Sequence, residues 1–234
     1  MNGLIGLAGV IGILLGAGLV VGLGNRAAFS PRWLLISALL VTLNDALLTN
    51  AYRLLPNMLG GTWNWQGKLL ALGASLAIAA MPAFGWRRTG LTLSQARGSW
   101  RPALAVGLLY AALFVAKALA FPGDKPDGET LAFQLTLPGL EEEVFYRGVL
   151  LLALDRAFTG RVTWLGVEWG WGSVLSCLLF GLAHAFGFSH GTFTFDPLTM
   201  ALTGGPAFLA VWLRLRTGSL ALPVVLHNLG NALP

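Results

Sequence analysis

Ionisable side chains interrupt the apolar C-terminal half at the segment LPGLEEEVFYRG, residues 137–148, which holds three successive glutamates and an arginine. A charge at mid-membrane costs about 2.5 kcal/mol or more, so such groups usually face a protein interior and serve a function. On a helix that begins near Pro138, Glu143 and Arg147 are four residues apart and can pair. Glu142 points about 100° away from Glu143, so it is left available for chemistry. The alternative is an ion pair at a helix end, favoured by the helix dipole.

Two later apolar segments carry histidines and amides at helical spacing. FGLAH places His184 one helical turn after Phe180, and HNLGN places His227 and Asn231 on one helix face while Asn228 turns away from it. Taken singly, His184 suits a satisfied core residue, and the polar pair suits hydrogen bonding between packed helices. Taken together with the glutamates, these residues supply a base, an orienting group and hydrogen-bond donors for an oxyanion. The set therefore predicts a site that activates water.

Other polar residues in apolar segments have simpler interpretations. Asn44 and Asp45 suit helix packing or an interfacial cap, His190 suits a solvated loop, and Cys177 suits a buried small residue. A single cysteine excludes an intrachain disulfide and a cluster of several cysteine ligands. Glu141, the first of the three glutamates, remains without a predicted partner or role.

The elements that position these residues are expected to be membrane-spanning helices. Hydrophobic residues make up 56% of the 234 residues and charged residues only 11%, against about 25% in a typical soluble domain. The chain is therefore predicted to be an all-α integral membrane protein, a bundle of about eight transmembrane helices with the site in the C-terminal half. The net charge of +5 is spread over connecting segments, so no nucleic-acid partner is expected. The predicted spans are 3–24, 33–49, 68–86, 102–121, 131–154, 173–187, 198–213 and 219–233.

Basic residues in the connecting segments predict the orientation of the chain. Alternate segments hold ten of the fifteen Lys and Arg residues, whereas the opposite set holds only Arg53, Lys68 and Lys125. Because basic loops stay on the cytoplasmic side, both termini are predicted to lie outside the cytoplasm. The site then lies in the outer half of the membrane. The ten residues are Arg26, Arg32, Arg87, Arg88, Arg97, Arg101, Arg156, Arg161, Arg214 and Arg216.

Three motifs in order resemble the CPBP family of intramembrane proteases (CAAX-protein proteolysis and bacteriocin processing, also called Abi). The family's marks are Glu-Glu-x-x-x-Arg, Phe-x-x-x-His and His-x-x-x-Asn helices, which appear here as EEVFYR, FGLAH and HNLGN. The motifs cover about 90 residues of the C-terminal half, whereas residues 1–130 match only in being hydrophobic. We expect one polytopic membrane domain over residues 1–234, with the motif-bearing spans in residues 131–234.

The resemblance implies a role for each matched residue. Glu142 would be the general base that activates water for attack on a peptide carbonyl, and His184 would help to hold that water. His227 and Asn231 would donate hydrogen bonds to the tetrahedral oxyanion. Glu143 and Arg147 would be supporting residues that fix the helix and tune the base. The implied activity is an intramembrane endopeptidase of the glutamate type, acting on a membrane-anchored or lipid-modified protein or peptide.

Several points stay open at the level of the sequence. No cofactor is expected, because there is no His-Glu-x-x-His motif, but Glu142, His184 and His227 could supply three ligands to zinc. The predicted location is a bacterial cytoplasmic membrane, with processing of C-terminal sorting signals near its outer face. CAAX-type processing at the cytosolic side is the alternative. Two other classes of protein fit the same residues. One is a transporter or channel that uses these ionisable residues, and the other is a non-catalytic scaffold.

Overall fold

The computed structural model describes residues 1–233 and contains helix within each of the eight predicted spans. Helices make up about 69% of the chain, which confirms the predicted all-α class. The longer helices are α1 (Asn2–Gly24), α2 (Pro31–Leu48), α4 (Trp65–Ala80), α5 (Trp100–Ala120), α9 (Trp171–Ala185), α10 (Pro197–Thr217) and α11 (Ala221–Asn231). The shorter elements are η1 (Arg26–Ala28), α3 (Asn50–Arg53), α6 (Gly128–Gln134), α7 (Leu137–Glu142), the π-helix η2 (Glu143–Leu150) and α8 (Leu151–Ala157).

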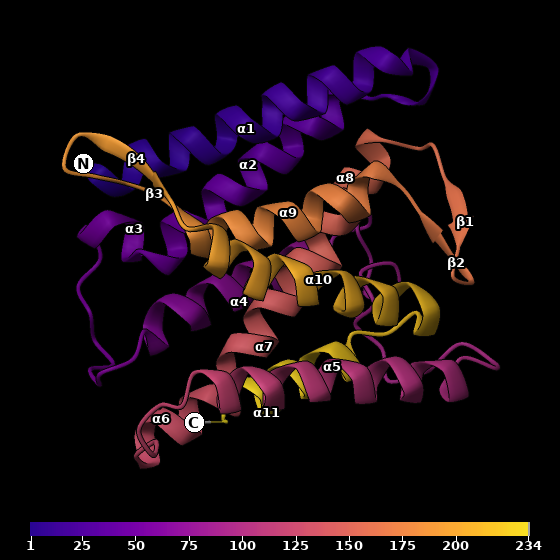
Figure 1. Cartoon of the computed structure of the whole chain (residues 1–234). Coiled ribbons are helices and arrows are strands. Elements are labelled where there is room, and N and C mark those ends of the chain that lie inside the picture. The colour runs from indigo at the N-terminus through magenta and orange to yellow at the C-terminus, as the bar shows by residue number, and fades with distance from the viewer. Residues whose placement is uncertain (234) are drawn as a thin grey trace. The chain divides into compact units, whose positions relative to one another are not determined.

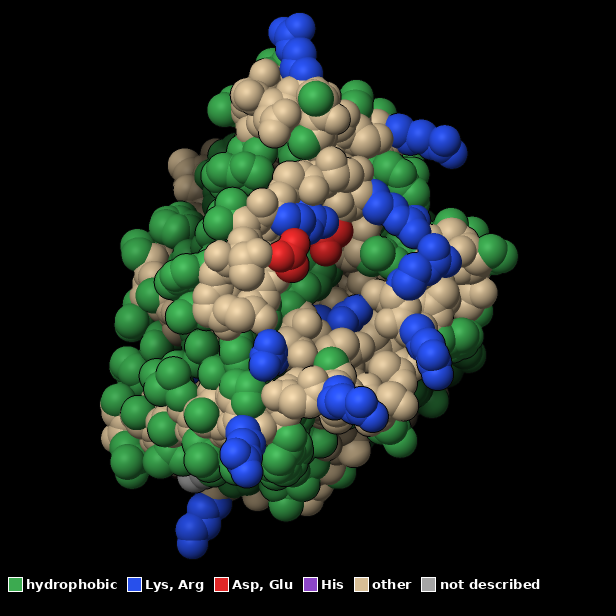
Figure 2. Space-filling view, turned by 90° about the vertical axis from the view of Figure 1, so that its right-hand side faces the viewer, with side chains coloured by type: hydrophobic (Ala, Val, Ile, Leu, Met, Phe, Trp, Pro, Cys, Tyr) green, Lys and Arg blue, Asp and Glu red, His purple; other side chains and the backbone are tan. Residues whose placement is uncertain are grey.

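Length and composition make four helices of the described chain, α1, α2, α5 and α10, suitable to cross a membrane. The apolar helix α9 is shorter. Large apolar side chains on these helices lie at the surface, including Val20 (74% exposed) and Leu119 (78%). On the face drawn in Figure 2, apolar side chains in green are exposed between Lys and Arg side chains in blue. Such a surface is costly in water and suits contact with lipid, as the composition predicts.

The segment predicted as one span over 131–154 is broken into four helical pieces. Helix α6 ends at Gln134, α7 starts at Leu137, and the chain then passes through η2 into α8. Pro138 has no N–H to continue the hydrogen-bond ladder from α6, and Thr136 leaves helical geometry with φ −123° and ψ −73°. The π-helical turns that follow are a form found frequently at functional sites.

Two short antiparallel hairpins, which were not predicted, connect helices in the described chain. Each turns through an X–Gly pair with positive φ at both positions, Leu165–Gly166 and His190–Gly191, as two-residue hairpin loops of the I′ kind require. The signal was present in the sequence as alternating β-formers around these pairs. The strands are β1 (Val162–Trp164) with β2 (Val167–Trp169), and β3 (Phe186–Ser189) with β4 (Thr192–Phe195).

The chain divides into two compact units, and each unit draws on both halves of the sequence. Unit 1 comprises Met1–Asp45 and Leu150–Phe208, and unit 2 comprises Ala46–Val149 and the C-terminal segment from Leu209. The elements α2, η2 and α10 contribute residues to both units. The motif helix α9 therefore belongs to unit 1, whereas α7 and α11 belong to unit 2.

In unit 1, helix α1 packs against α9 and the β3–β4 hairpin (Figure 1). Gly9 permits this approach, because a Cβ atom there would lie 2.8 Å from ring carbons of Phe186 and Phe193. At one end of the unit, the loop after α1 meets the loop after α8. Ser30 N–H donates to the Ala157 carbonyl at 2.8 Å. Arg26, Arg32, Arg156 and Arg161, which lie in or next to these two loops, are thus at the same end of unit 1.

In unit 2, helix α7 packs against α4, α6 and α11, and α11 also lies along α5 (Figure 1). The loop after α4 meets the segment after α10, where the Leu220 N–H donates to the Gly90 carbonyl at 2.9 Å. The segment before α4 meets the start of α6, where the Thr62 N–H donates to Glu129 at 2.9 Å. Loops that the charge pattern assigns to the same side of the membrane therefore meet within unit 2, while the side itself stays a prediction.

Candidate active site

The three glutamates lie at the end of α7 and the start of η2, and two of them are fully buried. Glu141 and Glu143 are 0% exposed, and the side chain of Glu142 is 13% exposed. A buried carboxylate is costly unless it is paired and hydrogen-bonded. Each of the three has a charged partner within unit 2: Lys68 contacts Glu141 and Glu142, and Arg147 contacts Glu143.

Glu143 is held by two partners. One of its oxygens accepts a hydrogen bond from Nδ1 of His227 at 2.8 Å, and the other lies 3.4 Å from Nε of Arg147. The predicted pair between Glu143 and Arg147 is therefore present. Arg147 is itself 1% exposed, so this ion pair is buried and breaking it would leave an uncompensated charge.

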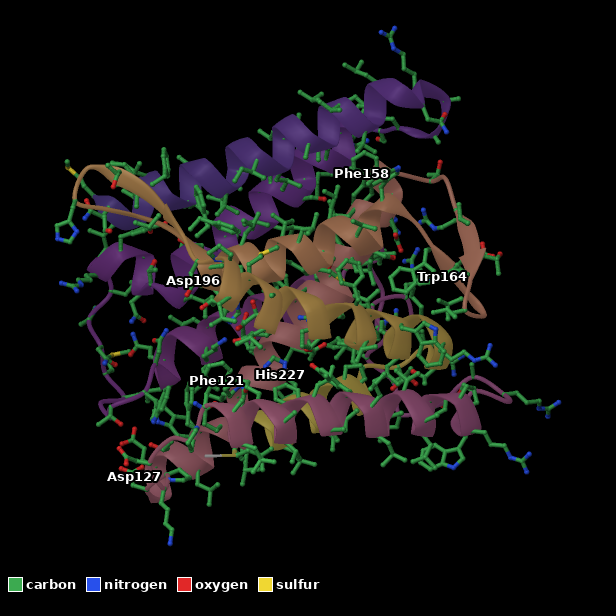
Figure 3. The ribbon with its side chains drawn as sticks, in the orientation of Figure 1. Phe121, Asp127, Phe158, Trp164, Asp196 and His227 are labelled. Carbon is green, nitrogen blue, oxygen red and sulfur yellow. The ribbon has the colours of Figure 1, made fainter. Side chains whose placement is uncertain are left out.

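His227 lies between two glutamates and is labelled in Figure 3. Its Nδ1 is bonded to Glu143, and its Nε2 lies 3.5 Å from the second oxygen of Glu142. Since an ionised carboxylate only accepts hydrogen bonds, Nδ1 carries the hydrogen of the bond to Glu143. The ring is therefore oriented with Nε2 toward Glu142, since a hydrogen bond to one ring nitrogen fixes which way the other points.

Lys68 is a site residue that the sequence analysis placed among the loop charges. Its ammonium lies 2.7 Å from Glu141 Oε2 and 2.6 Å from Glu142 Oε1, and its side chain is only 12% exposed. Lys68 therefore does not belong among the basic residues of the loops. Without it, the predicted difference in the number of basic residues between the two sets of loops is larger. The available signal was a lysine at the start of an apolar span in a chain with three consecutive intramembrane acids. Glu141, which had no predicted role, is the partner of this lysine.

The amides of α11 differ in their surroundings. Asn228 accepts a hydrogen bond from Gly139 N–H at 2.7 Å and donates to the Thr136 carbonyl at 2.9 Å, so it fastens α11 to the start of α7. The prediction that Asn228 turns away from the face of His227 agrees with this contact. Asn231, one turn after His227, is half-buried near the end of α11. Asn228, which had no predicted role, anchors the helix that carries His227.

His184 lies in unit 1, in the last turn of α9, and its side chain is exposed. Its Nδ1 donates to the Phe180 carbonyl at 2.8 Å, and the two rings lie with centroids 4.7 Å apart. The Phe-x-x-x-His spacing thus has a local cause, because the phenylalanine supports the imidazole ring one turn later. With Nδ1 occupied, Nε2 is the nitrogen that remains for chemistry.

The other polar residues agree with their simpler interpretations. His190 lies exposed at the tip of the β3–β4 hairpin, Cys177 is buried, and Asn44 is buried in α2. Over residues 1–233, no group of three or more His, Cys, Asp or Glu side chains has the geometry of a metal site. The cation in contact with Glu142 is the Lys68 ammonium. The expectation that no cofactor is needed stays a prediction.

The comparison with known protein families matches residues 129–233 to the model described as type II CAAX prenyl endopeptidase Rce1-like. The matched stretch is 105 of the 234 residues. The resemblance inferred from the three motifs is confirmed, because the match spans the glutamates, His184 and α11. No curated protein and no solved structure matches the chain.

The match to the Rce1-like model supports a CAAX-type intramembrane protease at the general level. The match begins at Glu129, so it covers α7 and α11 but leaves out α4 and Lys68. The N-terminal 128 residues, which the motifs also did not reach, thus supply one of the two cations that contact the glutamates.

Proposed function

We propose that the protein hydrolyses a peptide bond of a lipid-modified or membrane-anchored substrate with water activated by Glu142. The observation that carries this proposal is the geometry of the Glu142 carboxylate. One oxygen is bound by Lys68 at 2.6 Å and the other lies 3.5 Å from His227 Nε2. A carboxylate held in this way presents one oxygen toward a place that a histidine nitrogen also reaches, which suits a general base.

The proposed reaction begins with a water that bonds to the Glu142 oxygen that faces His227. As the water oxygen attacks the peptide carbonyl, its proton passes to Glu142 and the carbonyl becomes an oxyanion. Glu142 then returns this proton to the amide nitrogen as the C–N bond breaks, which regenerates the carboxylate and releases an acid and an amine. The role of His184 in holding the water stays the expectation that the three motifs imply.

The oxyanion is stabilised by His227 and Asn231 in this proposal. His227 is bonded to Glu143 through Nδ1, and its Nε2 faces Glu142, so its ring is placed to hydrogen-bond a group bound beside Glu142. Donors aimed at developing negative charge in a water-poor site are worth more than the same donors in water.

The substrate proposal follows the family name, which refers to prenylated C-terminal motifs. Purified full-length protein in proteoliposomes would be tested with a farnesylated C-a-a-X peptide, the same peptide without the lipid, and a membrane-anchored reporter with a C-terminal sorting signal. We expect the lipidated or anchored substrates to be cleaved, and cleavage of the unlipidated peptide alone would contradict the proposal.

The base is tested by Glu142→Gln, which keeps size and removes the negative charge. We expect kcat to fall by about 10²- to 10⁴-fold, the usual contribution of general acid–base catalysis. Glu168→Gln is the matched control, since Glu168 bonds to Thr163 in the exposed β1–β2 hairpin. Undiminished turnover of Glu142→Gln would refute the assigned base.

The side of the membrane on which cleavage occurs is proposed from charge. The loop pairs that meet within each unit are those that the positive-inside pattern assigns to one side, which supports a consistent topology. We propose that both termini lie outside the cytoplasm and that the site opens to the outer half of a bacterial cytoplasmic membrane. Reporter fusions at each terminus test this, and cytoplasmic termini would instead favour processing at the cytosolic face.

A further inference from the structure

Lys68 lies at a position where a cation needs a specific reason. It is in the first turn of α4, whose N-cap is Asn64, and the positive end of a helix dipole disfavours a nearby cation. Its side chain is also largely removed from solvent, which is costly for an ammonium group. Two carboxylates, those of Glu141 and Glu142, offset both costs at 2.7 Å and 2.6 Å.

The start of α4 is fixed so that this lysine keeps its place. Asn64 accepts from the N–H of Gly67 at 3.1 Å, and the Gln66 amide donates to Asn50 at 3.0 Å and to the Pro56 carbonyl at 2.9 Å. Gly67 has no room for a side chain because a Cβ atom would collide with the carbonyl of Leu48 and with Asn64. The backbone on the N-terminal side of Lys68 is therefore anchored by contacts unrelated to the glutamates.

The two carboxylates differ in what the lysine does for them. Glu141 is 0% exposed and adjacent in sequence to Glu142, so without the ammonium two like charges would lie together in a water-poor interior. Glu142 has its second oxygen toward His227, so the bond from Lys68 to the first oxygen limits rotation of the carboxylate. Lys68 thus both compensates charge and orients the proposed base.

We propose that Lys68 is a positioning residue of the protease site, which neutralises Glu141 and fixes the Glu142 carboxylate so that one oxygen faces His227. The inference rests on the proposed role of Glu142 as the base. Cleavage would then depend also on a residue outside the matched residues 129–233, because Lys68 lies 74 positions before Glu142. Lys68 acts through Glu142 and does not contact substrate.

The test uses the full-length protein in proteoliposomes with the substrate that wild type cleaves best. Lys68→Met removes the charge at similar length, and we expect kcat to fall about 10²-fold, the effect of a misplaced reacting group. KM should stay within about twofold, because the lysine does not bind substrate. Lys68→Arg should retain most activity, since a guanidinium can bind two carboxylates. Lys125→Met, in an exposed loop, is the matched control and should match wild type.

The decisive measurement is the kcat of the double variant that combines Lys68→Met with Glu141→Gln. Removing the buried acid together with its cation should recover a measurable part of the kcat lost in Lys68→Met. Unchanged kcat in Lys68→Met, or a double variant as impaired as the single one, would overturn the inference while leaving the proposed function intact.

If wild type cleaves none of the three substrates, the proposed function fails. Thermal unfolding of the same variants then still tests whether Lys68 compensates the charge of the buried Glu141. Lys68→Met should lower Tm by roughly 6 to 20 °C, as loss of one partner of a buried ion pair does. Glu141→Gln should restore part of that loss. Equal Tm values for Lys68→Met and Lys125→Met would overturn the inference on this measurement alone.

Discussion

Gly139 lies where α7 and α11 approach most closely around the site, so adding one methyl group there should separate the two helices. A Cβ atom at this position would lie 2.5 Å from Asn228 Oδ1 and 2.9 Å from the Val224 carbonyl oxygen, against 3.4–4 Å in ordinary contact. The Val224 oxygen is backbone, so it cannot turn aside. Asn228 can rotate only by giving up its bonds to Gly139 and Thr136. We therefore expect Gly139→Ala to displace α11 by several tenths of an ångström or more.

The expected cost follows from these two contacts. Overpacking a well-packed interior costs typically 1–3 kcal/mol, and loss of the Gly139 hydrogen bond adds about 1 kcal/mol. A total of about 2–4 kcal/mol corresponds to a Tm lower by roughly 5 to 15 °C for a chain of this size. Because α11 carries His227 and α7 carries Glu142, a shift approaching 1 Å should also lower kcat by about 10²-fold.

The assay compares Gly139→Ala with a glycine-to-alanine change in open space. Gly73, within α4, has no atom near its would-be Cβ, and alanine favours helix over glycine by up to about 1 kcal/mol. Gly73→Ala should therefore equal or exceed wild type in Tm and match it in cleavage. A Tm for Gly139→Ala within about 2 °C of the Gly73→Ala value would refute the close packing of α7 on α11.

Three further predictions follow from the same geometry. Glu143→Gln removes the charge that holds His227 and Arg147, and we expect it to lower Tm and kcat together, whereas loss of kcat alone would show that the glutamate acts chemically. Hydrogen bonds from the Trp65 indole and from backbone N–H groups hold the pKa of the Glu129 carboxyl below its usual range. The stabilisation from these contacts is therefore present above the ordinary pKa of a glutamate, and it is lost as the pH falls through the lowered pKa of the folded protein. Tryptophan fluorescence should change on acidification below about pH 4, and the change should be absent in Glu129→Gln. Treatment with EDTA or phenanthroline should leave cleavage unchanged if the site uses no metal, and loss that zinc restores would revive the zinc alternative.

Much of the site follows from the sequence because its signals are local. Glu143 and Arg147 pair across one helical turn, and His184 lies against Phe180 one turn before it, so spacing alone predicts both contacts. The apolar composition predicts the membrane class and the positions of the helices. The break before α7 was also encoded locally, by Pro138, but the apolar run on both sides concealed it.

Tertiary structure decided how the charges are distributed among partners. Lys68 meets Glu141 and Glu142 from more than 70 positions away, and Asn228 meets Gly139 across 89 positions. Helical periodicity fixes which residues share a face of one helix, but it carries no information on which face of a second helix lies opposite. The sequence by itself therefore determined the chemical groups and their local order. Packing of α4 and α11 on α7 determined that Lys68 and His227 hold opposite oxygens of Glu142.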